Sequence, residues 1–528
     1  MAAQRRKMVT ITVFDGAGCI GGNKIHLGLM DGQGRESGLF FDFGLNYSKL
    51  GQYYEEFLRP RSNRGIHDLL AMGIVPPLTC YRQDLCPCDI NTSAARRVAV
   101  DAVLLSHAHM DHIGHASLLD LDIPFVCTPT TAAIMKSLRD CNRGDFQYDG
   151  PYTSLRRQNE DEPRCISSTK QYIGRDFVLT ADCNHEFHNF WSTTPSVKYA
   201  KRAPQNYEPG TIDPISSLDL DIKCYPVDHS IYGAVAYAVD TEAGWIVYSG
   251  DLRTHGRNGH GTLAFAEKAR DLCPRLLIVE GTRASREDRE ESEDLVEENC
   301  LRATNEENGL VIGDFGPRNV ERLETFHRIA RATNRELVVL PKDAYLLEGL
   351  RCADGVNRLS GLRIYDEMKS REDKYEEEIR DRFANRLVGA EEIADDPGSF
   401  ILSFSFWDMG RMLDIRPGGG TYIYSSSEAY SEEQQIDFRR LSNWLARLGM
   451  KAVGFRMTVR NGREVPEHVP GYHASGHIAP YDLLDLVRTI RPHTVMPVHT
   501  EAPEFFVEGL KGEGINVLIP QEGRTYHL

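Results

Sequence analysis

Short apolar runs that stop abruptly at a polar residue or a glycine recur along this chain. Residues 9–13 alternate between apolar and polar positions. Six further runs are largely apolar, at 39–41, 103–105, 222–227, 246–248, 276–279 and 495–498. Runs of this length with polar or glycine boundaries predict buried β-strands.

A helical pattern interrupts these strands in the second half of the chain. Between 320 and 332 the apolar residues recur at helical spacing, and a strand-like run follows at 337–340. Another strand-like run at 422–424 precedes an amphipathic stretch at 438–448. Strands that alternate with helices predict an α/β fold with a parallel sheet in this region.

Acidic residues and histidines directly follow five of the predicted strands. They are Asp42, His229, Asp251, Glu280 and His499. In layered α/β folds, functional sites gather where strands end. We therefore expect these five side chains to lie close to one site.

The densest group of such residues occupies positions 107–112, with the sequence His-Ala-His-Met-Asp-His. Neutral imidazole and carboxylate are the usual ligands of zinc and similar cations. His107 and His109 can point the same way from an extended segment, while Asp111 and His112 turn back as a helix begins at about Ile113. Four ligands in one turn predict a space for two cations, because one tetrahedral zinc needs fewer.

The order of these motifs resembles the metallo-β-lactamase superfamily. Asp42 is similar to its first acid, residues 107–112 to its second motif, His229 to its third and Asp251 to its fourth. The resemblance implies an αββα sandwich that holds the metal site.

The second half of the chain narrows the resemblance to the β-CASP nucleases of that superfamily. Glu280, His477 and His499 are similar to motifs A, B and C of this group, and residues 473–477 and 497–501 most resemble ribonuclease J. An inserted β-CASP α/β domain is therefore expected within the sandwich.

The motifs also divide the chain. We expect residues 1–285 and 456–528 to form the metallo-β-lactamase domain and residues 286–455 to form the β-CASP domain. Residues 46–91 and 140–212 look like insertions. We expect them to shape substrate entry or to contact a protein partner, which includes a second copy of the chain.

The resemblance assigns a role to each candidate residue. His107, His109 and His229 would bind one metal, and Asp111, His112 and His499 the other. Asp251 would bridge the two ions, and Asp42 would orient a ligand imidazole. His477 would contact the scissile phosphate and protonate the leaving oxygen, with Glu280 holding it in place. His473, Ser425 and Ser426 would contact phosphate, although the two serines are as well explained as hydroxyls that cap a turn.

These roles predict a metal-dependent ribonuclease that hydrolyses RNA, as an exonuclease or an endonuclease, through a hydroxide bridging two divalent ions. Zinc is expected, with Mn²⁺ or Mg²⁺ as alternatives. RNA is favoured over DNA because motif C carries His499. Two alternatives stay open: a DNA nuclease or nucleotide phosphodiesterase of the same fold, and an inactive scaffold or binding module.

The net charge of −16 is unusual for a nuclease, because nucleic-acid binding normally uses a basic surface. Much of the acid lies in residues 286–307 and 366–382, which we interpret as solvated helix faces. Six arginines at useful places would supply a local basic channel: Arg253, Arg257, Arg283, Arg318, Arg322 and Arg411.

Composition is consistent with a soluble cytoplasmic enzyme that does not enter a membrane. No apolar stretch reaches the roughly 20 residues needed to span a bilayer. The twelve cysteines are scattered, as in reduced proteins. Cys80, Cys86 and Cys88 could form a structural zinc site, but free thiols are the better explanation. His185 and His188 are expected on a surface loop.

Overall fold

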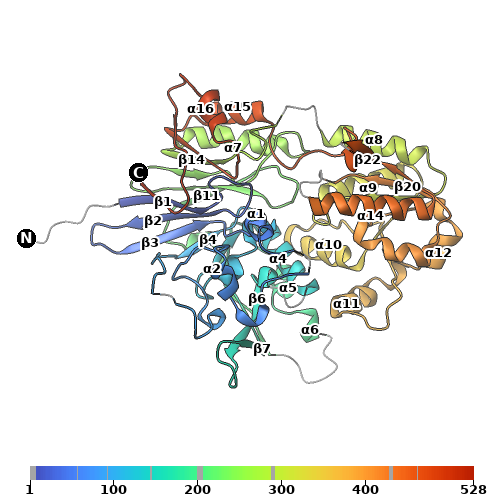
Figure 1. The fold of residues 1–528 in the computed structure, drawn as a ribbon, viewed down its shortest axis with the longest axis horizontal. Helices are drawn as coiled ribbons and strands as arrows, with labels where there is room; N and C mark the ends of the chain where they lie inside the picture. The colour runs from blue at the N-terminus through green and yellow to red at the C-terminus, as the bar shows by residue number, and fades with distance from the viewer. Residues whose placement is uncertain are drawn as a thin grey trace, which may run out of the picture.

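Two large β-sheets face each other, and a third sheet forms a separate lobe (Figure 1). The computed structural model describes residues 8–55, 57–91, 93–142, 146–198, 206–286, 292–426, 432–460 and 462–528. The two facing sheets share an apolar core in which Ile11 and Leu104 of one sheet join Tyr237 and Ile278 of the other. This is the sandwich that the resemblance to the metallo-β-lactamase superfamily implied.

The first sheet has eight strands in the order β10-β8-β5-β4-β3-β2-β1-β26. Strand β1 pairs antiparallel with β26 and β2, and β2 pairs antiparallel with β3. From β3 the sheet continues in parallel through β4, β5, β8 and β10. The strands are β1 (Met8–Asp15), β2 (Lys24–Met30), β3 (Glu36–Phe41), β4 (Ala102–Leu104), β5 (Phe125–Cys127), β8 (Phe177–Leu179), β10 (Ile212–Pro214) and β26 (Thr525–His527).

The second sheet has six strands in the order β11-β12-β13-β14-β24-β25. Strand β24, from the end of the chain, pairs in parallel with β14, so that Glu280 lies opposite Val498. This pairing brings the end of the chain to the site. The strands are β11 (Ile222–Pro226), β12 (Val235–Val239), β13 (Ile246–Tyr248), β14 (Leu276–Glu280), β24 (Thr494–Val498) and β25 (Asn516–Val517).

Helices cover both outer faces of the sandwich (Figure 1). The second sheet packs against α7 (Gly259–Asp271), α15 (Pro480–Ile490) and α16 (Glu504–Gly509). The first sheet packs against α2 (His67–Ala71) and α4 (Pro129–Cys141), and α1 (Tyr47–Gly51) lies nearby. The αββα architecture is thus confirmed.

The third sheet has seven strands, all parallel, in the order β18-β17-β16-β19-β15-β20-β21. The predicted helix at 320–332 is α9 (Val320–Ala332), and the predicted strand at 337–340 is β16 (Glu336–Val339). The other strands are β15 (Leu310–Asp314), β17 (Arg363–Tyr365), β18 (Leu387–Val388), β19 (Phe400–Leu402), β20 (Gly420–Tyr424) and β21 (Met450–Val453). The other helices are α8 (Glu293–Asn305), α10 (Pro341–Asp354), α11 (Lys374–Arg382), α12 (Ala390–Asp395), α13 (Met412–Ile415) and α14 (Glu432–Leu448).

A two-stranded hairpin leads from this lobe back to the sandwich. It consists of β22 (Phe455–Arg460) and β23 (Arg463–His468), which pair antiparallel. We propose residues 286–455 as the inserted domain that contains the third sheet, with residues 1–285 and 456–528 as the sandwich.

The insertion at 140–212 contacts the third-sheet lobe of the same chain. It contains β6 (Tyr152–Gln158), β7 (Ile166–Gly174), β9 (Tyr207–Glu208), α5 (His185–Trp191) and α6 (Pro195–Lys198). Tyr345 of α10 donates a hydrogen bond to Asp140 at 2.8 Å, and Lys198 pairs with Glu378 of α11 at 2.7 Å. Residues 143–145 and 199–205 of this insertion lie outside the described residues.

The prediction of a loop at His185 and His188 is wrong, because both belong to α5. The side chain of Asn184 accepts a hydrogen bond from the Phe187 N–H and so caps the helix start. Both histidines are exposed, as expected.

All twelve cysteines are free, as expected. Cys80 is buried, Cys86 is partly buried and Cys88 is exposed. Among the described residues, none of these three belongs to a group that could hold a metal. The choice of free thiols over a structural zinc site stays a prediction.

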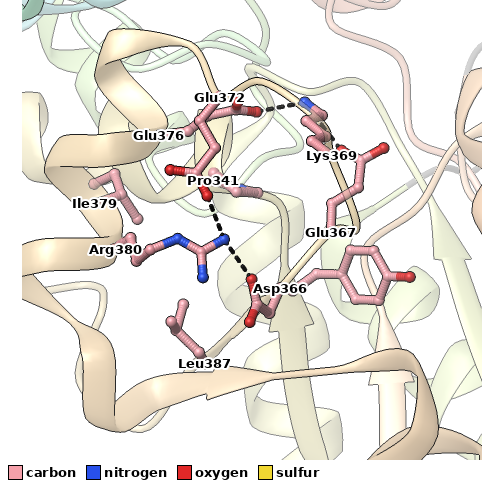
Figure 2. A pocket seen from close by; sticks show the side chains of 10 residues that line it. Pro341, Asp366, Glu367, Lys369, Glu372, Glu376, Ile379, Arg380 and Leu387 are labelled. Atoms are coloured by element: carbon pink, nitrogen blue, oxygen red, sulfur yellow. Dashed lines mark hydrogen bonds and ion pairs between the residues drawn. The ribbon is translucent and has the colours of Figure 1, made fainter.

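The acidic run at 366–382 is largely neutralised by its own cations (Figure 2). Lys369 lies 2.6 Å from Glu376, and Arg380 lies 2.6 Å from both Asp366 and Glu372. In the other run, residues 287–291 lie outside the described residues. The solvated-face interpretation of that run is wrong for Glu293, which is 1% exposed because it joins a buried ion network.

No helix in the described part of the chain has the length and apolar character that crossing a bilayer requires.

Candidate metal centre

The candidate ligands leave the strand ends with an unusual backbone. Asp42 after β3 and His499 after β24 have φ angles of 55° and 53°. Residues other than glycine rarely adopt this conformation, which persists where the surrounding structure enforces it. Here the His499 N–H donates to Gly16 O at 2.9 Å, and the Asp42 N–H donates to Leu104 O at 3.0 Å. The turns thus direct both side chains toward the same centre.

The motif at 107–112 differs from the prediction in one detail. The short helix α3 (Met110–Ile113) begins at Met110 and ends where the sequence pattern predicted its start. His109 is the N-cap residue with extended backbone. Asp111 and His112 therefore project from the first turn of the helix, while His107 and His109 project from the extended segment before it.

Three imidazoles converge to form the first ligand set. Nδ1 of His109 lies 3.1 Å from Nε2 of His107 and 3.0 Å from Nε2 of His229. Tetrahedral zinc with Zn–N bonds of about 2.0–2.1 Å places its nitrogens about 3.3 Å apart. The three residues His107, His109 and His229 thus have the separations that one cation requires.

Two histidines and two carboxylates form the second set, which consists of Asp111, His112, Asp251 and His499. Nε2 of His499 lies 3.3 Å from Oδ2 of Asp111, and Nε2 of His112 lies 3.0 Å from Oδ2 of Asp251. The sequence separates these residues by up to 388 positions. The pairing of β24 with β14 brings them together.

Asp251 lies between the two sets. Its Oδ2 is 3.8 Å from Nε2 of His107 and 3.9 Å from Nε2 of both His229 and His499. Its Oδ1 is buried and, among the described residues, has no hydrogen-bond partner. A buried carboxylate oxygen without a partner is costly unless a cation or donor satisfies it. The donor set therefore fits two divalent ions with Asp251 between them.

Hydrogen bonds orient the ligand imidazoles from behind. Nδ1 of His112 donates to Oδ2 of Asp42 at 2.7 Å, and Tyr248 OH donates to the same oxygen at 2.6 Å. Thr282 donates to Glu280 at 2.6 Å and so accepts from Nδ1 of His499 at 2.8 Å. In each case a proton sits on Nδ1 and Nε2 faces the centre, the orientation that a metal ligand requires.

The charge states also suit a metal. Burial lowers the pKa of His107 and His109 well below the usual value, and it lowers the pKa of His229 to about 4. These imidazoles are neutral at pH 7, with lone pairs available for a cation. Burial also lowers the pKa of His112, but the charges of Asp251, Asp111 and Asp42 outweigh it and hold the pKa well above the usual value. This excess of negative charge favours a cation.

His477 and Glu280 form a pair beside the centre. Nδ1 of His477 lies 3.0 Å from Oε2 of Glu280 and 3.7 Å from Oδ2 of Asp251. Burial lowers the pKa of His477, but the charges of Glu280 and Asp251 and the hydrogen bond to Glu280 outweigh it and raise the pKa to about 9. The raised pKa favours the protonated form of His477. Its Nδ1 contacts Glu280, and its Nε2 takes no part in that hydrogen bond.

The three residues expected to contact phosphate, Ser425, Ser426 and His473, differ in their exposure and in their contacts. Ser425 is buried, and its hydroxyl donates to Tyr472 O at 2.6 Å and accepts from Arg322. These internal contacts favour the structural explanation for Ser425. Ser426 and His473 are partly exposed. Burial lowers the pKa of His473 to about 3, so it is neutral at pH 7.

The predicted basic channel is wrong for two of its arginines. Arg253 and Arg322 are fully buried and pair with Glu293. Arg411 pairs with Glu367 at 3.0 Å, and Arg257 pairs with Glu297. Arg318 lies partly exposed beside the centre, where it donates to Ala108 O at 3.0 Å.

The sequence did not single out Thr282, Tyr248 or Ser106, which orient the candidate ligands. Ser106 Oγ donates to Oδ2 of Asp42 at 2.7 Å and lies 3.0 Å from Nδ1 of His107. The only signal was adjacency, since Ser106 precedes His107 and Thr282 follows Glu280 by two positions.

Comparison with known proteins finds relatives over most of the chain. The chain is 23% identical over 416 residues to ribonuclease J of Pyrococcus abyssi, covering 77% of this chain and 75% of the relative. It is 21% identical to ribonuclease J of Sinorhizobium meliloti, covering 79% and 61% of the two chains. It is also 21% identical to ribonuclease J of Methanocaldococcus jannaschii, covering 76% and 75%. The chain is similar to ribonuclease J.

The whole length of this ribonuclease J-like chain matches a solved structure. A protein of unknown function from Enterococcus faecalis V583 aligns with a TM-score of 0.67 and 22% identity, covering 99% of this chain and 100% of that one. No family model matches the chain. The fold is the metallo-β-lactamase sandwich with the β-CASP insertion that the motifs predicted.

Purified protein is expected to contain about two divalent ions per chain, with zinc favoured by the histidine-rich ligands. His109→Ala removes a ligand of the first set and should lose about one ion. His185→Ala removes an exposed histidine far from these ligands and should keep both. Elemental analysis of desalted protein measures the content. A content well below one ion, with activity retained in chelator, would contradict the assignment.

Proposed function

We propose that this chain is a metal-dependent ribonuclease that hydrolyses phosphodiester bonds in RNA. One observation carries the proposal: Asp251 lies between two ligand sets, and the His477–Glu280 pair lies directly beside them. A simple metallohydrolase needs the ligand sets alone. The similarity to three proteins named ribonuclease J supports RNA as the substrate.

The ligand sets define what the metal contributes. When bound, two divalent ions lower the pKa of a shared water and neutralise charge on the phosphate. His107, His109 and His229 would hold one ion, and Asp111, His112 and His499 the other. Asp251 fixes their spacing, and Asp42 and Thr282 keep the imidazoles in the correct tautomer.

His477 is proposed as the proton donor. Its Nδ1–H donates to Glu280, so the imidazolium keeps an Nε2–H for the leaving oxygen of the substrate. The charge of Glu280 stabilises the imidazolium, which keeps the proton available at neutral pH. Arg318, His473 and Ser426 are proposed to contact phosphates of the RNA.

The alternatives differ in substrate or in activity. A DNA nuclease or nucleotide phosphodiesterase could use the same ligand sets. An inactive scaffold would have no need of two complete sets and a buried Asp251 oxygen without a partner. The cytoplasmic location stays a prediction.

We expect purified protein to cleave 5′-labelled RNA in the presence of Zn²⁺ or Mn²⁺ and to cleave DNA of the same sequence much more slowly. Parallel reactions with Zn²⁺, Mn²⁺ and Mg²⁺, and with Asp251→Ala as the inactive control, test both points. Release of labelled mononucleotide would indicate an exonuclease acting from the 5′ end, and internal fragments an endonuclease. Equal cleavage of DNA would contradict the choice of RNA, and no cleavage of either would favour the scaffold.

A further inference from the structure

The loop that carries His477 is held through its backbone carbonyls. Residues 471–479, which lead from the hairpin to α15, contain no helix or strand. Gly476 O accepts a hydrogen bond from Nδ1 of His229. Ser475 O accepts from Nη1 of Arg253 at 3.1 Å and from Nε2 of His255 at 2.9 Å. The sandwich thus fixes the part of the loop next to His477.

The third-sheet lobe holds the start of the same loop. Tyr472 O accepts a hydrogen bond from Ser425 Oγ at 2.6 Å and from Nη1 of Arg322 at 3.5 Å. Ser425 follows β20, and Arg322 lies in α9. The side chain of Asn299 in α8 donates to Gly471 O at 2.9 Å. The His477 loop is therefore anchored by both lobes at once.

One buried carboxylate joins the two arginines. Oε1 of Glu293 lies 3.0 Å from Nη1 of Arg253 and 2.9 Å from Nη2 of Arg322, and its Oε2 lies 3.0 Å from Nε of Arg322. Arg253 also pairs with Asp228 at 3.2 Å and with Glu321. Glu293 begins α8, and Arg253 comes two residues after Asp251.

A buried network of ion pairs is not an efficient way to stabilise the folded protein. Burying charges carries a large desolvation cost, and well-packed apolar residues often stabilise a protein as well or better. Arg253, Glu293 and Arg322 are each no more than 1% exposed. The planar, bidentate contact of Arg322 with Glu293 fixes geometry more tightly than apolar packing does.

We propose that Arg253, Glu293 and Arg322 are positioning residues that hold His477 in place for protonation of the leaving oxygen. The inference rests on the proposed role of His477. None of the three side chains is itself a candidate metal ligand. Because Gly476 O of the same loop contacts the candidate ligand His229, the metal content of each variant shows whether it acts on the proton donor alone. A displacement of about 1 Å in a catalytic group can cost roughly 100-fold in rate.

The substrate can separate this role from a general effect on folding. RNA has a poor leaving group, a ribose oxygen that needs a proton. Bis(p-nitrophenyl) phosphate releases p-nitrophenolate, which needs none. Misplacing His477 should therefore slow RNA cleavage and spare the nitrophenyl ester, whereas loss of folded protein or of metal should slow both equally.

The test uses Arg322→Lys, which keeps the charge and loses the planar fork. We expect kcat for RNA to fall roughly 10- to 100-fold, a scale set by misplacing a catalytic group. KM, metal content and the rate with bis(p-nitrophenyl) phosphate should change little. Arg175→Lys is the matched control: Arg175 is 1% exposed and donates to Leu119 O and Ile123 O, away from the His477 loop. It should change the two substrates in parallel.

Two further variants distinguish an error in the positioning role from an error in the role of His477. Ser425→Ala removes one donor to Tyr472 O and one acceptor of Arg322, but it leaves the ion pairs of Glu293 with Arg253 and Arg322 in place. A smaller selective loss is therefore expected in this variant if Arg322→Lys fails to fold. His477→Ala, measured on both substrates, tests the proposed proton donor itself. If His477→Ala slows both substrates equally, the role of His477 fails and the inference falls with it. If His477→Ala is selective while the Arg322 and Ser425 variants slow both substrates equally or neither, the positioning inference alone is wrong.

Discussion

Asp251→Ala is expected to abolish RNA hydrolysis, with kcat/KM lower by roughly 10⁴-fold or more, the scale on which residues that act as a catalytic unit are lost. Oδ2 of Asp251 lies within 3.9 Å of nitrogens from both ligand sets, so its removal affects both ions at once. It also removes the charge that balances the two cations. Hydrolysis, metal content and the thermal unfolding temperature should be measured on the same preparation.

Two other substitutions test whether the lost charge of Asp251 causes this loss of activity. Asp251→Asn keeps the shape of the side chain and removes its charge, and it should lose nearly as much activity as the alanine variant. Asp240→Ala removes an exposed carboxylate at the end of β12 and should behave like the unaltered protein. Near-normal turnover in Asp251→Ala would show that the carboxylate does not bridge the ions, whatever the metal content.

The strand pattern predicted the arrangement of the site because of one topological property. The sequence shows which acidic residues and histidines follow an apolar run. Parallel strands in a sheet bring their carboxyl ends, and so these residues, to the same edge of the sheet. Asp42, Asp251, Glu280 and His499 were therefore identified without a structure. Their proximity depends on the pairing of β24 with β14, which apolar periodicity does not specify.

The residues that orient the ligands were beyond such reasoning. Thr282 bonds to His499, 217 positions away, and Tyr248 bonds to Asp42, 206 positions away. Serine, threonine and tyrosine are common in every part of the chain, so only three-dimensional contact distinguishes these few.

The prediction of a basic channel was wrong for Arg253 and Arg322 for a related reason. The sequence shows which arginines stand near the motifs. It does not show which carboxylates these arginines contact in the folded chain. Arg253 and Arg322 are near the motifs because they hold the backbone there, with Glu293 between them. The similar error at His185 came from a short helix whose start depends on one capping side chain, Asn184.

His477→Ala is expected to slow RNA cleavage by roughly 10²–10⁴-fold, the usual range for loss of a general acid. The metal content should stay near that of the unaltered protein, because His477 belongs to neither of the two ligand sets, although it forms a third group of possible ligands with Asp251 and Glu280. Cleavage of RNA and metal content must be measured in the same preparation. Loss of an ion in this variant would make His477 a ligand and would overturn the division of roles.

Glu280→Gln tests the same pair through pH. A proton donor acts in its protonated form, so activity should fall as pH rises through the pKa of His477. Burial lowers that pKa, and the charge of Glu280 is the largest factor that raises it. Removing this charge lowers the pKa, so the alkaline limb of the kcat profile should move to lower pH while the rate at its plateau falls less than in His477→Ala. An unchanged alkaline limb would mean that another group donates the proton, and full RNA cleavage in both variants would mean that the His477–Glu280 pair takes no part in the reaction.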